Sequence, residues 1–297
     1  MEYEVKKLKR LRTRGHRVVL NRSAGGDAGI TAILVIFGLF MFIPMYYVVI
    51  QSFKPLDELF MFPPRFYVKN LTFENYSDLF ILMSDSWVPF SRYIVNTVFI
   101  TACGTLGNLT LASMTSYGLA KLRFPGRQLM FNLIVFSLMF HSTVNQVTHF
   151  ILLSAFGWVD TYLSLIVPSL ASTMGLYLMK QFMDSAVPDT VLESARLDGA
   201  SEFRIYWSIA MPMVKPATLT LIIETFRGLW NTGASIYIHS EQLKTFNYAI
   251  SQILSGGVAR SGAGAASTVI MMIVPISIFV INQSKIVETM GSSGMKD

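Results

Sequence analysis

Residues 187–212 read VPDTVLESARLDGASEFRIYWSIAMP and form a hydrophilic break between two long apolar stretches. Pro188 suits a first helical turn, Asp189 favours the positive end of a helix dipole, and Gly199 suits a left-handed helix end. Ser201 can cap a second helix. The stretch therefore predicts two short helices joined at Gly199, which need other surfaces to pack on. The apolar residues at helical spacing are Val191, Leu192 and Ala195 in the first helix and Phe203, Tyr206, Trp207 and Ala210 in the second.

The composition of the whole chain is that of a membrane protein. Apolar residues make up 52% of its 297 positions and charged residues only 14%. Crossing a bilayer takes roughly 20 apolar helical residues, and stretches of about that length recur along the chain. We therefore predict an all-α membrane protein with six transmembrane helices, in which the fifth retains Glu224 and Arg227. The expected spans are 29–50, 93–118, 128–147, 161–180, 213–234 and 265–285.

Charge fixes the expected orientation of these spans. Residues 1–28 form a basic tail without the pattern of a cleaved signal peptide, and we expect it in the cytoplasm, where it can meet anionic lipid. Six spans place both termini inside, so 289–297 is a second cytoplasmic tail and 29–288 is the membrane domain. The loop 185–212 then lies inside. The net charge of +6 reflects basic residues that flank spans, which argues against a nucleic-acid partner.

The sequence lacks the residues required for disulfide bonds, metal binding, ATP binding and the common types of enzyme site. Cys103 is the one cysteine, so no intramolecular disulfide or thiolate metal cluster is possible. The chain has no G-x-x-x-x-G-K-[ST] motif for ATP and no H-E-x-x-H, paired-carboxylate or nucleophile-elbow pattern of an enzyme. His141 and His149 are poorly spaced for a metal site. We expect no catalytic residue, metal or cofactor on this chain.

The break at 187–212 resembles a known motif. Glu193-Ser-Ala, then Gly199 six positions later, then Ile209-Ala-Met-Pro212 is similar to the EAA loop of ABC importer permeases, whose pattern is E-A-A, three residues, G, nine residues, I-x-L-P. The departures are Ser194 for alanine and Met211 for leucine. Further similarity at Gly157-Trp-Val-Asp, Leu197-Asp-Gly-Ala and Trp230-Asn, from about residue 92 to the C-terminus, is to the carbohydrate-uptake branch of maltose-type permeases.

The resemblance implies a fold, a role and partners. The fold is that of type I ABC importer permeases, in a bacterial or archaeal cytoplasmic membrane, and the loop docks on a separate ATPase. The implied partners are a second homologous permease, two ABC ATPase subunits that hold ATP and Mg²⁺, an extracytoplasmic solute-binding protein facing the loop 232–264, and a carbohydrate substrate. The residues implied in ATPase coupling are Glu193, Ala195, Asp198, Gly199, Ala200, Ile209 and Pro212.

Polar residues recur on single helical faces of three expected spans. Such groups are costly in hydrocarbon and usually face the bundle interior or a water-filled pathway. One interpretation is that these residues line a substrate pathway. The other is that they form hydrogen bonds between helices, with Glu224 and Arg227 paired within one helix. The candidate pathway residues are Asn108, His141, Asn145, Glu224, Arg227, Trp230 and Asn231. An ion- or proton-coupled secondary transporter, with Glu224, Arg227 and the histidines as coupling groups, is the alternative function.

Overall fold

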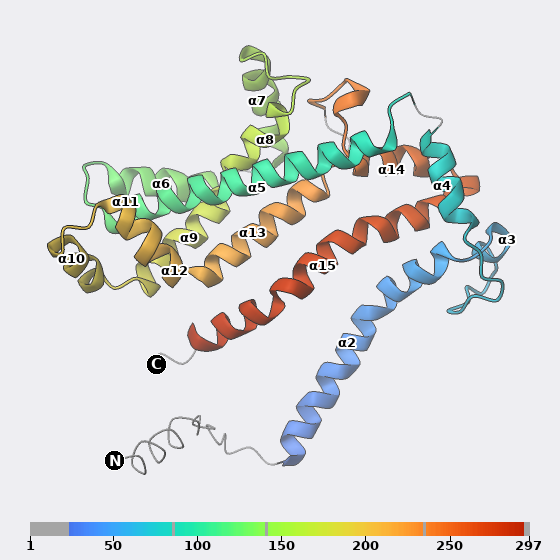
Figure 1. The fold of residues 1–297 in the computed structure, drawn as a ribbon, viewed down its shortest axis with the longest axis horizontal. Helices are drawn as coiled ribbons and strands as arrows, with labels where there is room; N and C mark the ends of the chain where they lie inside the picture. Colours follow the sequence, from blue (N-terminus) through green and yellow to red (C-terminus); the bar gives the residue numbers. More distant parts are fainter. Residues whose placement is uncertain (1–23, 85–86, 140–141, 234–235, 294–297) are drawn as a thin grey trace, which may run out of the picture. The chain divides into compact units, whose positions relative to one another are not determined.

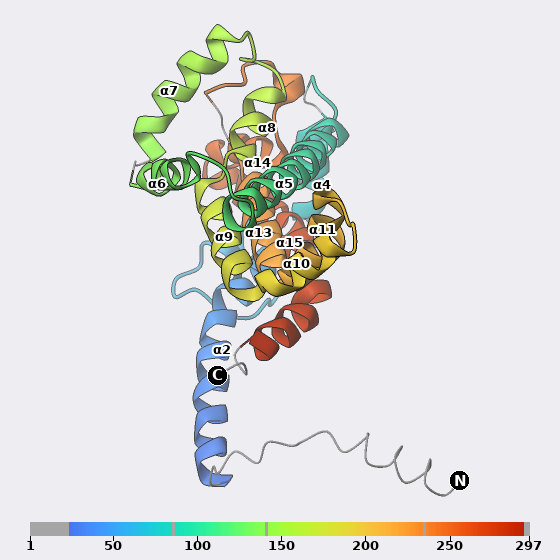
Figure 2. The same cartoon turned by 90° about the vertical axis from the view of Figure 1, so that its left-hand side faces the viewer.

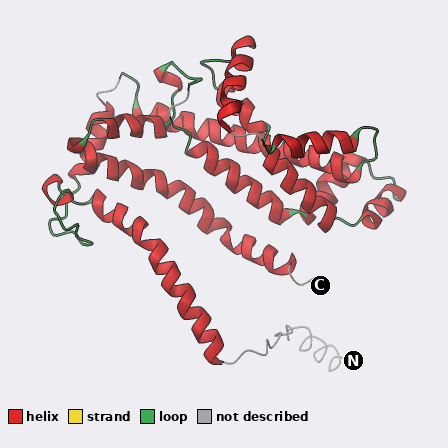
Figure 3. Ribbon diagram, turned by 180° about the vertical axis from the view of Figure 1, so that it is seen from behind, coloured by secondary structure: helices red, strands yellow, loops and turns green. Residues whose placement is uncertain are grey.

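The structure, a computed structural model, describes residues 24–84, 87–139, 142–233 and 236–293, with only the backbone at 24, 142–145, 282 and 284–293. Those residues form helices joined by loops, and no strand occurs among them (Figure 3). The chain divides into two compact units, residues 1–49 and 50–297. The described part of the first unit is helical and belongs to α2 (Ala24–Ser52), which is apolar around its whole circumference, as expected of a lipid-embedded helix.

The second unit is organised around one long helix. α5 (Phe90–Lys121) lies against α8 (Leu163–Leu170), α9 (Thr173–Ala186) and α13 (Lys215–Trp230), as Figure 1 shows. The contacts are close because glycines face the neighbours. A β-carbon on Gly104 would lie 2.4 Å from a Leu229 methyl carbon. Small residues at helix contacts favour packing in membranes, where the hydrophobic effect does not hold helices together.

A buried cluster of side chains lies near the start of α5. Here α4 (Glu74–Ser84) and α14 (Phe246–Ser255) pack on α15 (Ser261–Ser293). Trp230 enters this cluster, and its indole donates a hydrogen bond to the Met271 carbonyl at 3.2 Å. The short elements nearby are α3 (Leu56–Leu59) and two 3-10 turns, η2 (Glu241–Leu243) and η3 (Val258–Arg260).

Four described helices are long and apolar enough to cross a membrane, judged by length and composition. They are Gly25–Ser52, Phe90–Lys121, Leu163–Ala186 and Val258–Ile281. A fifth results if α13 and the segment Glu202–Met213, which meet at 84°, count as one broken span. The all-helical membrane class is therefore confirmed. Beyond it, the described residues give four or five candidates where the sequence predicts six spans.

The expected third span is where structure and prediction differ most. Residues 128–147 were predicted as one helix, but the structure has two, α6 (Arg127–Ser137) and α7 (Ser142–Ala155), which run in different directions in Figure 2. At the end of α6 the backbone tightens, because Leu138 and Met139 donate to carbonyls three residues back. Ser137 also donates to the Ile134 carbonyl at 2.7 Å. Backbone 3-10 hydrogen bonds of this kind are frequent in the last turn of an α-helix.

Candidate functional site

The loop singled out by the sequence consists of short helices around one glycine. α10 (Asp189–Leu197) is followed by Asp198 and then by Gly199, whose φ of 79° is left-handed. The hydroxyl of Ser201 then accepts a hydrogen bond from the Arg204 amide at 3.4 Å and caps α11 (Glu202–Ile205). A π-helical turn, η1 (Tyr206–Ala210), and α12 (Met211–Met213) complete the loop. Both the left-handed glycine and the serine cap are thus confirmed.

One side of this loop is anchored to the membrane helices. Leu192, Ile205 and Tyr206 are buried in a cluster with residues of α5 and α9. Ala195, Ala200 and Ile209, which were predicted to serve coupling, are half-buried and pack on the same cluster. Their small or apolar side chains seat the loop on its own chain.

The other side of the loop is exposed. Glu193, Asp198 and Pro212 lie there, together with three large apolar side chains that the motif does not mark. These are Leu197, Phe203 and Trp207, exposed by 89%, 66% and 57%. The expected common face of Phe203, Tyr206, Trp207 and Ala210 is wrong, because Tyr206 and Ala210 are buried. We call Leu197, Phe203 and Trp207 the exposed apolar surface of the loop.

Charged residues connect the loop to the end of α5. Lys121 pairs with Asp189 at 2.8 Å, and Arg196 pairs with Glu202 at 2.6 Å. The Lys121 ammonium lowers the pKa of Asp189, and the Glu202 carboxylate raises the pKa of Arg196. Both pairs border a cavity of about 550 Å³. It is lined by Ala120, Lys121, Leu122, Arg123, Arg127, Asp189, Glu193, Arg196 and Glu202.

The candidate pathway residues divide by burial. Asn108 is fully buried, and its amide donates to the carbonyls of Ser169 and Leu170 at 2.8 and 3.3 Å. Trp230 is 6% exposed and stacks on Phe226. Both side chains therefore bind neighbouring helices in this conformation. His141 lies outside the described residues, as does the side chain of Asn145.

The accessible candidates lie on α13 and at its C-terminal end. Glu224 and Arg227 of α13 form an ion pair at 3.4 Å, with side chains 69% and 67% exposed. Asn231 follows on the same side, is exposed, and donates to the Arg227 carbonyl at 2.9 Å. The intrahelical pair that the spacing suggested is therefore present. It is also exposed on the helix surface, where another molecule can reach it.

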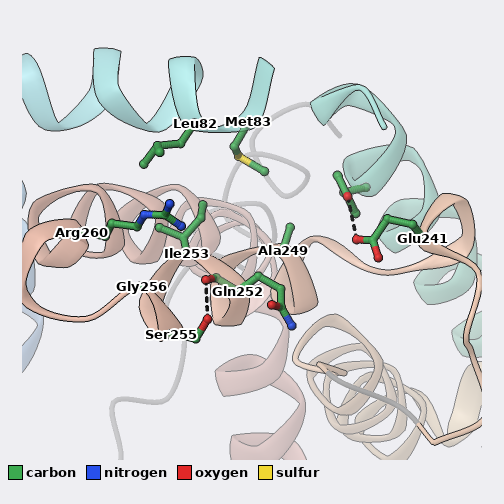
Figure 4. A pocket seen from close by; sticks show the side chains of 10 residues that line it. Leu82, Met83, Glu241, Ala249, Gln252, Ile253, Ser255, Gly256 and Arg260 are labelled. Atoms are coloured by element: carbon green, nitrogen blue, oxygen red, sulfur yellow. Dashed lines mark hydrogen bonds between the residues drawn. The ribbon is translucent and has the colours of Figure 1, made fainter. Parts of the chain in front are cut away.

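A second cavity of about 550 Å³ lies at the opposite end of α5 (Figure 4). Glu241 on one wall accepts a hydrogen bond from the Tyr93 hydroxyl at 2.9 Å, and Gln252 and Arg260 lie on the other wall. The segment that carries Glu241 is fastened to the helices. Asn96 donates to the carbonyls of Gln242 and Lys244, and Asp160 accepts from the amides of His239 and Ser240. No described group of histidine, cysteine, aspartate and glutamate could hold a metal ion.

Comparison with known proteins decides the family. The sequence profile described as "Binding-protein-dependent transport system inner membrane component" matches residues 108–289, more than half of the chain. The chain belongs to this family of permeases. It is thus a multi-pass component of the cytoplasmic membrane and part of an ABC importer, without a catalytic site of its own. In such permease systems ATP is handled by a partner ATPase.

Individual relatives of this permease agree with the family. It is 26% identical over 247 residues to the "Polygalacturonan/rhamnogalacturonan transport system permease protein YtcP" of Bacillus subtilis, covering 80% of this chain and 84% of that protein. It is 32% identical over 143 residues to the "sn-glycerol-3-phosphate transport system permease protein UgpE" of Yersinia enterocolitica, covering 48% of this chain and 50% of that protein. The permease thus spans about half the length of this second relative.

A solved structure shows the same fold. It is a chain of a bacterial ABC transporter involved in the import of the acidic polysaccharide alginate, and the TM-score is 0.74 at 20% identity. The match covers 89% of this permease and 98% of that chain. The family's permease fold is therefore shown for nearly the whole chain.

Proposed function

We propose that this permease is one membrane half of a carbohydrate importer and that the loop 185–212 carries the force of its ATPase. Its partners are a second homologous permease, two ABC ATPase subunits and an extracytoplasmic solute-binding protein. The chain crosses the membrane six times, with both termini and the loop in the cytoplasm. The end of α5 at Lys121 is then cytoplasmic, and the end at Phe90 faces outward.

The exposed apolar surface of the loop carries the proposal. Large apolar side chains exposed together on a surface mark protein docking sites, and Leu197, Phe203 and Trp207 are exposed by 89%, 66% and 57% within this one short loop. Glu193 and Asp198 are exposed on the same loop and can pair with basic groups of the ATPase. The opposite face of the same loop is packed on α5 and α9. A segment anchored on one side and apolar on the other is suited to pass motion between two proteins.

The substrate class rests on the relatives. The two permeases named above act in polygalacturonan/rhamnogalacturonan and glycerol phosphate systems, and the similar structure is from an alginate importer. We assign this permease a saccharide or a polyol derivative. Glu224, Arg227 and Asn231 on α13 form the accessible part of its pathway, since an exposed ion pair within a span favours a water-filled channel. Asn108, His141, Asn145 and Trp230 complete the candidate set, and the first and last of these reach substrate only if the helices move.

A matched pair of tryptophan substitutions tests the docking surface. Trp207→Ser removes an exposed ring from the loop, and Trp87→Ser removes one that is 85% exposed in the segment between α4 and α5. Each variant is co-expressed with the other subunits, purified in detergent, and assayed for bound ATPase. We expect Trp207→Ser to lose most of the ATPase and Trp87→Ser to retain it. Equal retention would overturn the proposed docking surface.

The substrate class has its own test. The complex is reconstituted in proteoliposomes with ATP inside and its solute-binding protein outside, and uptake is measured for neutral saccharides, uronides and polyol phosphates. ATP-dependent uptake of one of these classes is expected. Uptake that persists after removal of the ATPase would instead favour the ion- or proton-coupled alternative.

A further inference from the structure

The end of α5 near Lys121 carries three polar side chains on one face. Ser113, Tyr117 and Lys121 are four residues apart, so they lie above one another about 6 Å apart along the helix. Each forms a hydrogen bond with a different part of the loop. Their partners are, in order, Tyr206 in the π-helical turn, Glu202 in α11 and Asp189 in α10. We call these three hydrogen bonds the α5 ladder.

The first bond of the ladder is buried. The hydroxyl oxygens of Ser113 and Tyr206 are 2.7 Å apart, and both residues are nearly inaccessible. Ser113 already donates to the Leu109 carbonyl at 2.6 Å, so Tyr206 is the donor in this bond. The rings of Tyr206 and Tyr117 also meet edge to face, with centroids 5.5 Å apart. Breaking this contact would leave a polar group buried without a partner, which is costly.

The second bond involves a charged group. The Tyr117 hydroxyl donates to Glu202 at 2.7 Å, and Arg196 donates to the other oxygen of the same carboxylate at 2.6 Å. One carboxylate thereby holds α5, α10 and α11 together. Hydrogen bonds to an ionised acceptor are about twice as strong as neutral ones.

The third bond lies at the helix end. The side chain of Lys121 is 5% exposed, whereas that of Asp189 is 72% exposed. The lysine is therefore held between the helices while its partner sits at the rim of the loop. With the two bonds above it, this pair fixes the loop at three points along α5, which resists both sliding and rotation.

The chain connects the loop directly to α9 and α13, but not to α5. The loop follows α9 through Val187 and Pro188, and it joins α13 where the chain bends by 84°. Because of this bend, a push on the loop is not directed along the axis of α13. α5 has no direct peptide link to the loop, but it is attached at three points.

We propose that the α5 ladder makes α5 move with the loop as one rigid piece during the transport cycle, with Tyr117 and Glu202 as positioning residues for coupling. The inference rests on the proposed role of the loop in ATPase docking. It adds that α5, which also contacts α8, α9 and α13, delivers the loop's motion to the helix bundle. Loss of the ladder therefore separates ATP hydrolysis from transport while the ATPase stays bound.

A distance measurement tests the rigid connection directly. In a Cys103→Ala background, spin labels are placed at Thr115 on α5 and Thr190 on α10, two exposed positions. The distance between them is measured in the assembled complex without nucleotide and after trapping with ATP and vanadate. The same narrow distance is expected in both states. A change in this distance of more than about 5 Å, the rise of one helical turn, would overturn the proposal.

Two variants and a matched control test the consequence. Tyr117→Phe and Glu202→Gln each weaken the second bond, and their combination is expected to lower solute transported per ATP about tenfold. Tyr177→Phe is the control, because this tyrosine of α9 stacks on Phe131 and its hydroxyl bonds to no other described residue. The control is expected to couple normally. Wild-type transport per ATP in the double variant would contradict the proposal.

The experiments distinguish failure of the α5 ladder proposal from failure of the docking proposal on which it rests. If the docking proposal fails, Trp207→Ser retains as much ATPase as Trp87→Ser, whether or not the ladder is intact. If only the α5 ladder proposal fails, the ATPase is bound and the labelled distance changes with nucleotide. The melting temperature of each variant shows whether lost coupling reflects a lost fold. A purely structural role would lower the melting temperature and the solute transported per ATP together.

Discussion

The side-chain oxygen of Asn108 accepts a hydrogen bond from the Thr225 hydroxyl at 3.1 Å and joins α5 to α13. The amide nitrogen of the same residue binds two carbonyls at the end of α8. One side chain therefore connects three helices, at a depth where each partner would otherwise be an unsatisfied polar group.

Replacing Asn108 is expected to weaken the helix bundle. Asn108→Ala removes the bonds to Ser169, Leu170 and Thr225, and hydrogen bonds between membrane helices contribute about 0.6–2 kcal/mol each. We expect a loss of about 1–3 kcal/mol, measured by thermal or denaturant unfolding in detergent. Asn132→Ala is the control, because Asn132 is exposed on α6 and bonds within its own helix to Gln128. Equal stability of the two variants would contradict this role.

Alanine substitutions at Gly199 and Gly118 distinguish the effect of backbone strain from that of steric crowding. A β-carbon would meet nothing within 4 Å at either glycine, but only Gly199 has a positive φ, of 79°. Gly199→Ala is expected to cost about 1–2 kcal/mol and to release the ATPase from the complex, because it strains the turn of the loop. Gly118→Ala lies within α5 and should be neutral or slightly stabilising. Bound ATPase after purification, together with unfolding curves, gives the comparison.

The contact between α15 and α4 depends on a missing side chain. A β-carbon on Gly262 would lie 2.0 Å from the amide oxygen of Asn75, which is nearer than atoms can approach. Asn75 is held by the carbonyls of Ser52 and Lys54 at 2.9 and 2.7 Å. Gly262→Ala is therefore expected to displace α4 and lower the melting temperature by several degrees, on the order of 1–3 kcal/mol. Gly228→Ala, where a β-carbon meets nothing within 4 Å, should leave the melting temperature unchanged.

Acid is expected to loosen the segment 236–243. The Ser240 hydroxyl and amide, followed by the His239 amide, hold the pKa of Asp160 below its ordinary value of 3.8. A lowered folded-state pKa stabilises the fold above the unfolded value, and this contribution is lost as the pH falls through the folded value. Hydrogen exchange of 236–243, corrected for intrinsic rates, should accelerate below about pH 4.

Asp160→Asn provides the comparison for the acid effect. The amide cannot ionise, so the variant should exchange faster at neutral pH and lose this pH dependence. Identical exchange profiles for the two proteins would show that the carboxylate does not hold the segment.

Local features of this chain followed from the sequence more readily than contacts did. Gly199 and Ser201 act within a few residues, so their roles in the loop were predictable and are confirmed. The exposed apolar surface was missed because helical spacing groups Phe203 with Tyr206. Only packing against Tyr117 of α5, 89 positions earlier than Tyr206, decides which of them is buried.

The same distinction explains the expected third span and the polar stripes. Apolar composition predicted one helix over 128–147, but the backbone hydrogen bonds at Leu138 and Met139 end α6 there. Helical spacing placed Asn108 and Glu224 on polar faces equally well. Their different surroundings, one fully buried and the other 69% exposed, depend on which helices are neighbours. Sequence spacing does not record that information.

The exposed ion pair of Glu224 and Arg227 also bears on how the protein is made. A helix that carries both charges on its surface inserts unfavourably into lipid. Each charge at the centre of a span raises the free energy of membrane insertion by about 2.5–3.5 kcal/mol. Under the proposed pairing with a second permease, the chain expressed alone should insert inefficiently at α13 and be degraded by membrane proteases. A second permease synthesised at the same time would give the charges a polar surface as they leave the translocon. The proposal therefore makes balanced synthesis of the two halves a requirement of biogenesis as well as of transport.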